Sequence, residues 1–241
     1  MLELRVLGQT DLRAPDMAAA RDLLAQPRPT ALLVYLAIAN PGSFIRRDHL
    51  ATLFWPETDQ EHARANLRKL MHALRTALGD AAVEARGDEE VRLASGALWC
   101  DAVAYEEAVA AGEPRKAIEV YRGPLLPGFI LPGSHTFETW LDATRRRMSR
   151  SAVKCALRSA HEHLQRQEHT AAGDLIQFVR QLEPELEDEH QLRNLLRLFA
   201  DLGDRVGALS MYERFRQRMW HEYHAQPAPE TRALAEALKH G

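Results

Sequence analysis

Residues 58–79 read Thr-Asp-Gln-Glu-His-Ala-Arg-Ala-Asn-Leu-Arg-Lys-Leu-Met-His-Ala-Leu-Arg-Thr-Ala-Leu-Gly, and this stretch decides the fold. Thr58 and Glu61 have the spacing of a capping box, which predicts a helix start. Pro56 prevents a helix from continuing into this stretch, and Gly79 provides a left-handed end. One side of the predicted helix is apolar and consists of Ala63, Leu67, Leu70, Met71, Leu74 and Leu78.

The other side of this helix is basic. It carries Arg64, Arg68, Lys69, His72, Arg75 and Thr76. No acid lies between His62 and Leu78, so the helix has four formal positive charges. A face of one sign with an apolar back is typical of a helix that lies against a phosphate backbone. The alternative is a solvated basic face.

Composition limits the remaining classes of function. The chain has 241 residues and a formal net charge of -3, so any nucleic-acid binding must be local. The two cysteines, Cys100 and Cys155, match no metal spacing and fit a reducing compartment. The first residues lack the pattern of a signal peptide, and no apolar run approaches the length of a membrane span.

Several elements are expected before residue 58. They are a strand at residues 2–6, a returning strand at 10–13, a buried helix at 30–39 and a second helix at 47–55. Gly8 is expected in the turn between the two strands. Residues 14–26 fit a helix by propensity and a third short strand equally well.

A hairpin is expected within residues 83–93, where two strand-like pieces flank Gly87. Three helices followed by a hairpin predict a winged helix-turn-helix, with the hairpin as the wing. Acids near its tip would repel phosphates: Asp88, Glu89 and Glu90. Arg86 and Arg92 would then be its only helpful side chains.

The rest of the chain is predicted to be helical. Helices are expected at about 101–111, 114–121, 135–167, 170–182, 188–202, 205–223 and 229–238. Asp101 is expected to cap the first of them, and residues 121–133 form a helix-free patch. Paired helices joined by short turns indicate a tetratricopeptide-like array, and the alternative is a single irregular bundle. The predicted fold is mainly α with a small β part. Its domains are a winged helix-turn-helix at 1–97 and a helical domain at 98–241.

The chain resembles the AfsR/SARP-type bacterial transcriptional regulators. Its N-terminal part carries Ala31-Leu-Leu-Val-Tyr-Leu-Ala37, Arg47-Asp-His-Leu50, Leu53-Phe-Trp-Pro56, Glu61-His-Ala-Arg-Ala-Asn-Leu67 and Leu74-Arg-Thr-Ala-Leu-Gly79. Its C-terminal part carries Tyr121-Arg-Gly123, Leu126-Pro-Gly-Phe129, Trp140 with 145–147, Ala208 with Tyr212-Glu-Arg214, and Gln226-Pro-Ala-Pro-Glu-Thr-Arg-Ala-Leu234. The segment 223–225 lacks the glycine that is usual before the final Pro-x-Pro element.

The resemblance implies a sequence-specific DNA-binding regulator, usually an activator, with an OmpR-like winged-helix domain and a bacterial transcriptional activator domain. Its implied partners are double-stranded promoter DNA, RNA polymerase and a second copy of the chain on repeated promoter sites. It also implies a cytoplasmic, nucleoid-associated protein without a membrane partner. The phosphate-binding motif Gly-x-x-x-x-Gly-Lys of the ATPase module in larger members is absent from this sequence.

Other chemistry finds little support in the sequence. His221 and His224 could meet on one helix, but no third ligand lies nearby, so no metal site is expected. The acids between Glu183 and Glu189 fit a solvated helix start. No nucleophile elbow or Ser-His-Asp order is visible, so we expect no catalytic residue, no cofactor and no enzyme.

The expected DNA-binding residues are Arg64, Arg68, Lys69, His72, Arg75 and Arg86. The major groove should be faced by Arg68, Lys69 and His72, and the minor groove by Arg86. Phosphates should be contacted by Arg64 and Arg75. Leu98 and Trp99 are expected to pack between the domains, so that both halves move as one body. The alternative function is a protein-interaction scaffold whose winged helix is a docking module.

Overall fold

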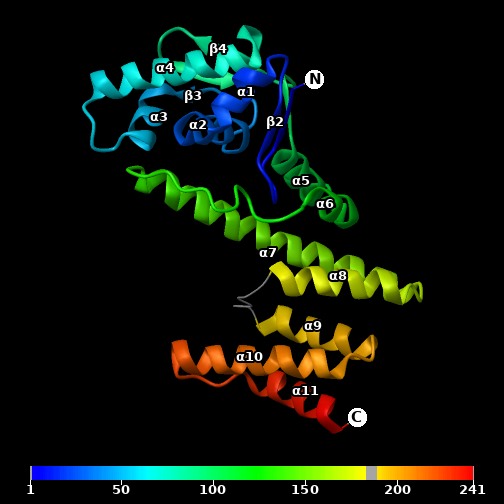
Figure 1. The fold of residues 1–241 in the computed structure, drawn as a ribbon. Helices are drawn as coiled ribbons and strands as arrows, with labels where there is room; N and C mark the ends of the chain where they lie inside the picture. The colour runs from blue at the N-terminus through cyan, green and yellow to red at the C-terminus, as the bar shows by residue number, and fades with distance from the viewer. Residues whose placement is uncertain (1, 183–188, 241) are drawn as a thin grey trace. The chain divides into compact units, whose positions relative to one another are not determined.

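The computed structural model describes residues 2–182 and 189–240 of the chain (Figure 1). The fold is mainly helical, with two small sheets. The chain forms two compact units, Met1–Ser149 and Arg150–Gly241. The expected domain boundary between residues 97 and 98 lies inside the first unit, and as a boundary between sequence modules it stays a prediction.

The first sheet has the strand order β2-β1-β6. β1 (Leu2–Arg5) pairs antiparallel with β2 (Asp11–Arg13) and parallel with β6 (Leu98–Cys100). The alternation of β1 buries Leu2 and Leu4 on one face and places Glu3 and Arg5, both half-buried, on the other. The expected first strand and its return at Gly8 are therefore confirmed.

The expected burial of Trp99 is wrong, because its side chain is 38% exposed. β6 places Glu3 beside Trp99 and Leu4 beside Cys100. Neighbours in register share a face of the sheet, so Trp99 lies on the outward face with Glu3 while Cys100 is buried with Leu4. Leu98 is half-buried.

The first four α-helices of the chain are α1 (Met17–Leu24), α2 (Pro27–Ile38), α3 (Arg47–Phe54) and α4 (Gln60–Leu78). The open alternative at residues 14–26 is resolved as a helix. α2 is buried along almost its whole length, as expected, but it begins at Pro27 rather than Thr30. Proline is favourable at the first helical position because the amide that it lacks would have no partner there.

The predicted capping box at the start of α4 is wrong by one residue. Asp59 is the N-cap, and its Oδ1 accepts from the backbone amide of His62 at 3.0 Å. The same carboxylate contacts Nδ1 of the His62 ring at 2.8 Å. Gly79 ends the helix with φ +93° and ψ 149°, which is an extended glycine conformation rather than the expected left-handed helical one.

The second sheet has the strand order β3-β5-β4. β4 (Val83–Arg86) and β5 (Glu90–Leu93) form the expected hairpin, and a short helical turn, η1 (Asp80–Ala82), precedes it. β3 (Ile45–Arg46) adds antiparallel to β5, just before α3. The hairpin is therefore attached to the segment that begins α3.

Two short helices, α5 (Asp101–Ala110) and α6 (Pro114–Val120), precede the helix-free patch. This patch lies against the end of β1: the amide of Leu126 donates to the carbonyl of Val6 at 2.8 Å. The guanidinium of Arg145 donates to the carbonyls of Leu125 at 2.8 Å and Phe129 at 3.2 Å, and to that of Leu126. The patch is thus held in place from both β1 and α7 (His135–Gln165).

An aromatic cluster holds the first half of α7 against α2 and α3. The ring centroids of Tyr35 and Trp140 are 4.8 Å apart, and those of Phe54 and Phe137 are 5.4 Å apart. Ser134, just before α7, donates from its hydroxyl to the carbonyl of Leu53 at the end of α3. The residues around α2 and α3 and the start of α7 therefore belong to one core, inside the first unit.

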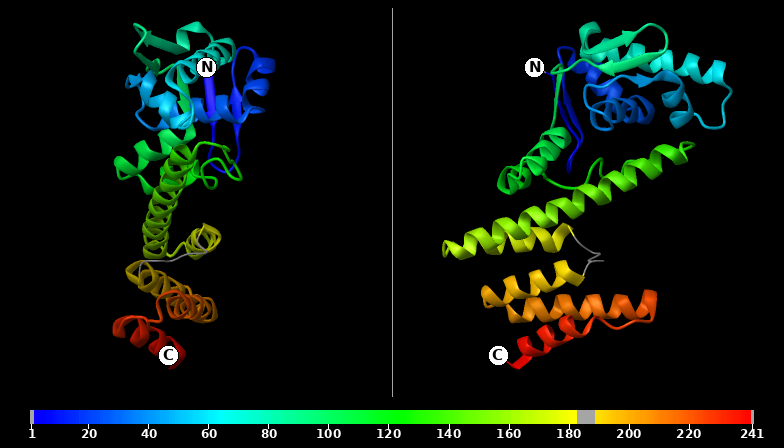
Figure 2. Two further views of the ribbon diagram at one scale, coloured as in Figure 1. Left: turned by 90° about the vertical axis from the view of Figure 1, so that its left-hand side faces the viewer. Right: turned by 180° about the vertical axis from the view of Figure 1, so that it is seen from behind.

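The second unit contains the end of α7, then α8 (His169–Leu182), α9 (Glu189–Asp201), α10 (Arg205–Tyr223) and α11 (Pro229–His240). Neighbouring helices run antiparallel as hairpins (Figure 2). The expected solvated acids at 183–188 lie outside the described residues. Glu189 is more than a solvated acid, because its carboxylate accepts from the amide of Ala228 at 3.0 Å and from the hydroxyl of Thr231 at 2.6 Å.

The segment 223–225, which lacks the expected glycine, contains His224. This residue ends α10 in the left-handed conformation, with φ +49° and ψ 33°. A residue with a Cβ is strained there, although less than a β-branched one would be. The segment that lacks the expected glycine therefore still ends α10 with a left-handed residue.

Asp101 joins the first sheet to α5. It is the first residue of α5 rather than its N-cap, and it is buried. Its carboxylate accepts from the amides of Val6 at 2.9 Å, Leu7 at 3.1 Å and Ala102 at 2.8 Å. Burial raises the pKa of Asp101, and these three amides act in the opposite direction.

We expect Asp101→Ala to lower the free energy of unfolding of the protein by about 2–4 kcal/mol. The substitution leaves the buried amides of Val6 and Leu7 without an acceptor, and each unmet buried donor costs about 1–3 kcal/mol. Urea unfolding followed by circular dichroism measures the change. Asp22→Ala, at an exposed position of α1, is the control and should stay within about 0.5 kcal/mol. Equal midpoints for both variants would contradict the role of Asp101.

Candidate functional site

The basic side of α4 faces solvent. Arg68, Lys69 and His72 are exposed, as predicted, and Arg75 is half-buried. The opposite side packs against α1, α2 and α3, where Leu67, Met71 and Leu74 are buried. Packing of this apolar side determines the direction of the cations, because residues one turn apart share a helix face.

Three of these cations have no acid partner in the part of the chain that the structure describes. Within residues 2–182 and 189–240, no ion pair joins Arg68, Lys69 or Arg75 to an aspartate or glutamate. Many other arginines of the first unit are paired, as Arg92 is with Glu84 at 2.7 Å and Arg147 is with Glu106 at 2.5 Å. The positive charge on this side of α4 is therefore available to an external anion.

Arg64 differs from the other predicted cations of α4. Its guanidinium pairs with Asp48 of α3, with Nε at 2.8 Å and a terminal nitrogen at 2.6 Å from Oδ1. This hydrogen bond raises the pKa of Arg64 above its ordinary value. The pair fixes α4 to α3 and leaves less of the Arg64 charge for a ligand.

A concave region of about 460 Å³ lies beside these residues. It is lined by Arg47, Arg64, Leu67, Arg68, Met71, Arg75 and Asp88. Four arginines against one aspartate make it strongly basic. Arg47 is a residue that sequence reasoning missed, because it lies at the start of α3 and meets the α4 arginines only in the folded chain.

Arg47 is positioned by the hairpin. Its backbone amide donates to the carbonyl of Glu89 at 2.8 Å, which ties the start of α3 to the hairpin turn. Its Nε is buried and has no hydrogen-bond partner in the described part of the chain. The signal for it in the sequence is a basic pair, Arg46-Arg47, directly before an apolar helix face.

The hairpin arginines are engaged within the protein. Arg86 pairs with Glu90 at 3.2 Å, and its guanidinium carbon lies 4.0 Å from the ring centroid of Phe44. Arg92 lies 4.3 Å from the same centroid and also pairs with Glu84. The predicted minor-groove residue, Arg86, is therefore held by a stacking contact and an ion pair. Among the three acids near the tip, Asp88 lines the basic region.

The chemistry of this site is that of anion binding. Guanidinium groups offer paired donors that match phosphate oxygens, and the concave region places several of them together. Burial raises the pKa of the Cys100 thiol to about 12, so the thiol is unreactive near neutral pH. In the described ranges, no group of three or more His, Cys, Asp or Glu could hold a metal, and no helix is long and apolar enough to cross a membrane.

Comparison with known proteins relates most of the chain to a family. A family described as "Bacterial transcriptional activator domain" matches residues 92–239. The structure of Mycobacterium tuberculosis EmbR in complex with a low affinity phosphopeptide is similar, with a TM-score of 0.67 and 21% sequence identity. The match covers 99% of this chain but only 65% of the EmbR chain. The comparison with curated proteins found no match.

The Asp59–His62 pair at the start of α4 leads to a testable prediction about pH dependence. The hydrogen bond and charge of Asp59 raise the pKa of His62, so the pair stabilises the helix start when His62 is protonated. That contribution is complete below the ordinary histidine pKa and is lost as the pH rises through the raised value. Asp59→Asn should lower the pKa of His62 measured by NMR titration, whereas Glu57→Gln should leave it unchanged. An equal pKa in both variants would contradict the pairing.

Proposed function

Because the chain belongs to the bacterial transcriptional activator domain family, we propose that it is a sequence-specific DNA-binding transcriptional regulator, and an activator. The family match agrees with the resemblance to SARP-type regulators, which are transcriptional regulators and not enzymes. The chain spans 65% of the EmbR chain, so the partners named below are proposals for this chain alone.

The N-terminal elements support an OmpR-like winged helix-turn-helix. α3 and α4 pack together, which fits the two helices of a turn motif, and the β4–β5 hairpin follows α4 after one short helical turn. In such domains the second helix enters the major groove and the hairpin lies beside the DNA. Here α4 would be the recognition helix, and the hairpin would be the wing.

The observation that carries the proposal is the unpaired charge on α4. Arg68, Lys69 and Arg75 have no acid partners among the described residues, on a protein with a net charge of -3. Phosphates of double-stranded DNA would supply the missing anions and release their counterions. A merely solvated face would not need the concave basic region beside it.

The side chains on this face divide into two roles. Arg68 lies on the exposed side of α4, and a guanidinium can bind the O6 and N7 atoms of guanine with two hydrogen bonds, so we assign base reading to Arg68. Lys69 and His72 flank it in the major groove. Arg75 and Arg47 line the concave region and would contact phosphates. Arg64 would position α3 and α4 through Asp48, and Arg86 would contribute less than its charge suggests.

The helical part would provide the remaining activities of an activator. Its antiparallel helix pairs support a tetratricopeptide-like array, a common protein-binding architecture. We propose that this part contacts RNA polymerase and that two copies bind repeated promoter sites. Such a protein acts in the cytoplasm, at the nucleoid.

The alternative is a protein-interaction scaffold in which the winged helix only docks to another protein. The helix pairs of the second unit favour that reading. A gel shift on the promoter next to the gene, with and without competitor DNA, separates the two functions. A scaffold would give no gel shift, or a shift that promoter DNA and random DNA compete away equally well.

We expect Arg68→Ala to weaken binding to cognate DNA by about 1–3 kcal/mol and to relax the preference at one base position. Arg75→Ala should instead weaken binding to cognate and random DNA alike and reduce the salt slope by about one unit, as the loss of one phosphate contact does. Fluorescence anisotropy over a range of salt concentrations measures both. Equal losses on cognate and random DNA for Arg68→Ala would refute its role in base reading.

The acids of the wing lead to a second prediction about the affinity for DNA. Asp88 faces the basic region, so Asp88→Ser should strengthen binding to random DNA at low salt by removing repulsion from phosphates. Glu119→Ser, at an exposed position of α6, removes the same charge away from the site and serves as the control. Identical affinities for Asp88→Ser and the unmodified protein would place the wing tip away from the DNA.

A further inference from the structure

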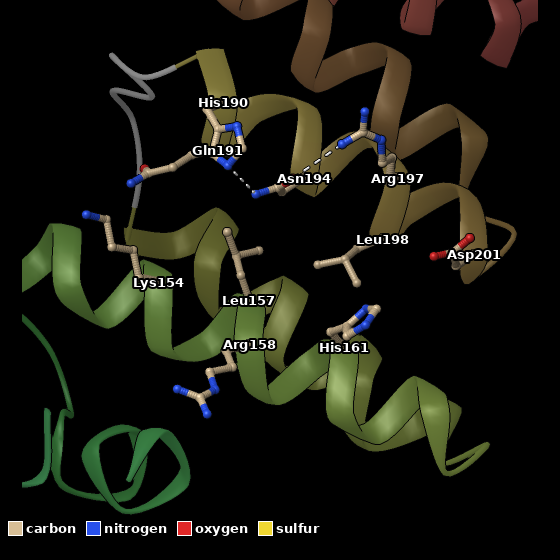
Figure 3. A pocket seen from close by; sticks show the side chains of 10 residues that line it. All are labelled: Lys154, Leu157, Arg158, His161, His190, Gln191, Asn194, Arg197, Leu198 and Asp201. Carbon is tan, nitrogen blue, oxygen red and sulfur yellow. Dashed lines mark hydrogen bonds between the residues drawn. The ribbon is translucent and has the colours of Figure 1, made fainter. Parts of the chain in front are cut away.

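A second concave region lies within the second unit, between the end of α7 and α9 (Figure 3). It has a volume of about 630 Å³, within the range of ligand-binding sites. Lys154 and Leu157 reach it from α7, and Gln191, Arg197 and Leu198 reach it from α9. We call it the α7–α9 groove. Nothing in the proposed contacts with DNA uses it.

The floor of the groove is apolar. In Figure 3, Leu157 projects from α7 toward α9, and Leu198 projects from α9 into the same space. Their exposed fractions are 8% and 5%, so both side chains are packed at their base and offer only their outer surface. This surface suits an apolar side chain that enters from outside.

The rim of the groove is positively charged. Lys154 and Arg197 are exposed, and within the described ranges neither forms an ion pair. The guanidinium of Arg197 contacts the neutral Asn194 amide oxygen at 3.5 Å, and within the described ranges no carboxylate balances its charge. Asp201 is the only acid among the residues that line the groove in the described part of the chain. The groove therefore has an excess of positive charge above an apolar floor.

Gln191 adds a polar group to the groove. Its side chain lines the groove and is 8% exposed, yet its amide forms no hydrogen bond within residues 2–182 and 189–240. A primary amide has one acceptor and two donor positions, which match the amide and carbonyl of a peptide backbone. Because the Gln191 amide forms no hydrogen bond with the described residues, its donors and acceptor are available to a ligand that enters the groove.

We propose that the α7–α9 groove binds an acidic peptide segment of a partner protein that carries an apolar side chain. Lys154 and Arg197 would bind carboxylates, Leu157 and Leu198 would contact the apolar side chain, and Gln191 would bind the peptide backbone. The apolar floor and the backbone-like amide distinguish this groove from the arginine-lined region beside α4, which suits a phosphate chain. The proposal is independent of DNA binding.

The test uses the full-length chain and a fluorescein-labelled peptide of sequence Asp-Glu-Leu-Asp-Glu-Leu-Asp-Glu. Its binding is followed by fluorescence anisotropy. We expect binding, and a loss of about tenfold or more in affinity for the Lys154→Glu/Arg197→Glu variant. Arg205→Glu/Arg214→Glu, an equal charge change at exposed positions of α10, should leave the affinity unchanged.

Three further measurements test the charge, the apolar contact and the independence from DNA. A peptide with Lys in place of every acid should bind the Lys154→Glu/Arg197→Glu variant better than the unmodified protein. A peptide with Ser in place of both leucines should bind the unmodified protein more weakly. Arg68→Glu/Arg75→Glu should abolish the DNA shift and leave peptide binding intact, so the failure of one proposal is distinguishable from that of the other.

The proposal is overturned if the acidic peptide does not bind, or if its affinity is insensitive to Lys154→Glu/Arg197→Glu in a variant that keeps the thermal unfolding midpoint of the unmodified protein. Loss of peptide binding in Arg68→Glu/Arg75→Glu alone would move the site to α4 and also overturn it. Binding only of a peptide with phosphoserines in place of the acids would replace the proposed partner by a phosphorylated one.

Discussion

Burial of one side of α4 is the constraint on which the first unit depends. Leu67, Met71 and Leu74 are removed from water against α1, α2 and α3, and burying a side chain of this size contributes about 1.5–3 kcal/mol. Because the helix has a fixed period, this packing fixes the side of α4 from which Arg68 and Lys69 project into solvent. The burial that stabilises the core therefore also determines the side of α4 on which the positive charges lie, and no separate contact is needed to orient them. The Arg64–Asp48 pair adds a polar connection between the same helices.

The parts of this fold that follow from local periodicity are predictable. The direction of the α4 cations, the strand at the N-terminus and the hairpin at 83–93 depend on neighbours within a few residues. The exact start of α4 is harder to predict, because Thr58 and Asp59 can both cap a helix and the backbone conformation at Asp59 decides between them.

The sequence-based predictions that are wrong concern residues whose partners are distant in the sequence. The size and apolar character of Trp99 favour an interface, but its direction depends on the register with Glu3 in β1. The tie between the helical part and α2 is formed instead by aromatic rings such as Tyr35 and Trp140. Arg47 escapes sequence reasoning in the same way, since it joins the α4 arginines through the hairpin turn. Sequence patterns predict which face of a helix or strand is apolar, and tertiary pairing decides which of these faces contact each other.

The position of β1 has a consequence for how the chain is made. Its end is completed by Asp101, which lies 95 positions later than Val6, and by the loop at Leu125 that Arg145 holds. During synthesis the first strand therefore has no complete set of partners until the loop at Leu125 has left the ribosome. Contacts of such high sequence separation slow the closure of a domain. The nascent chain exposes an unpaired β edge over this interval, when chaperones and aggregation compete for it.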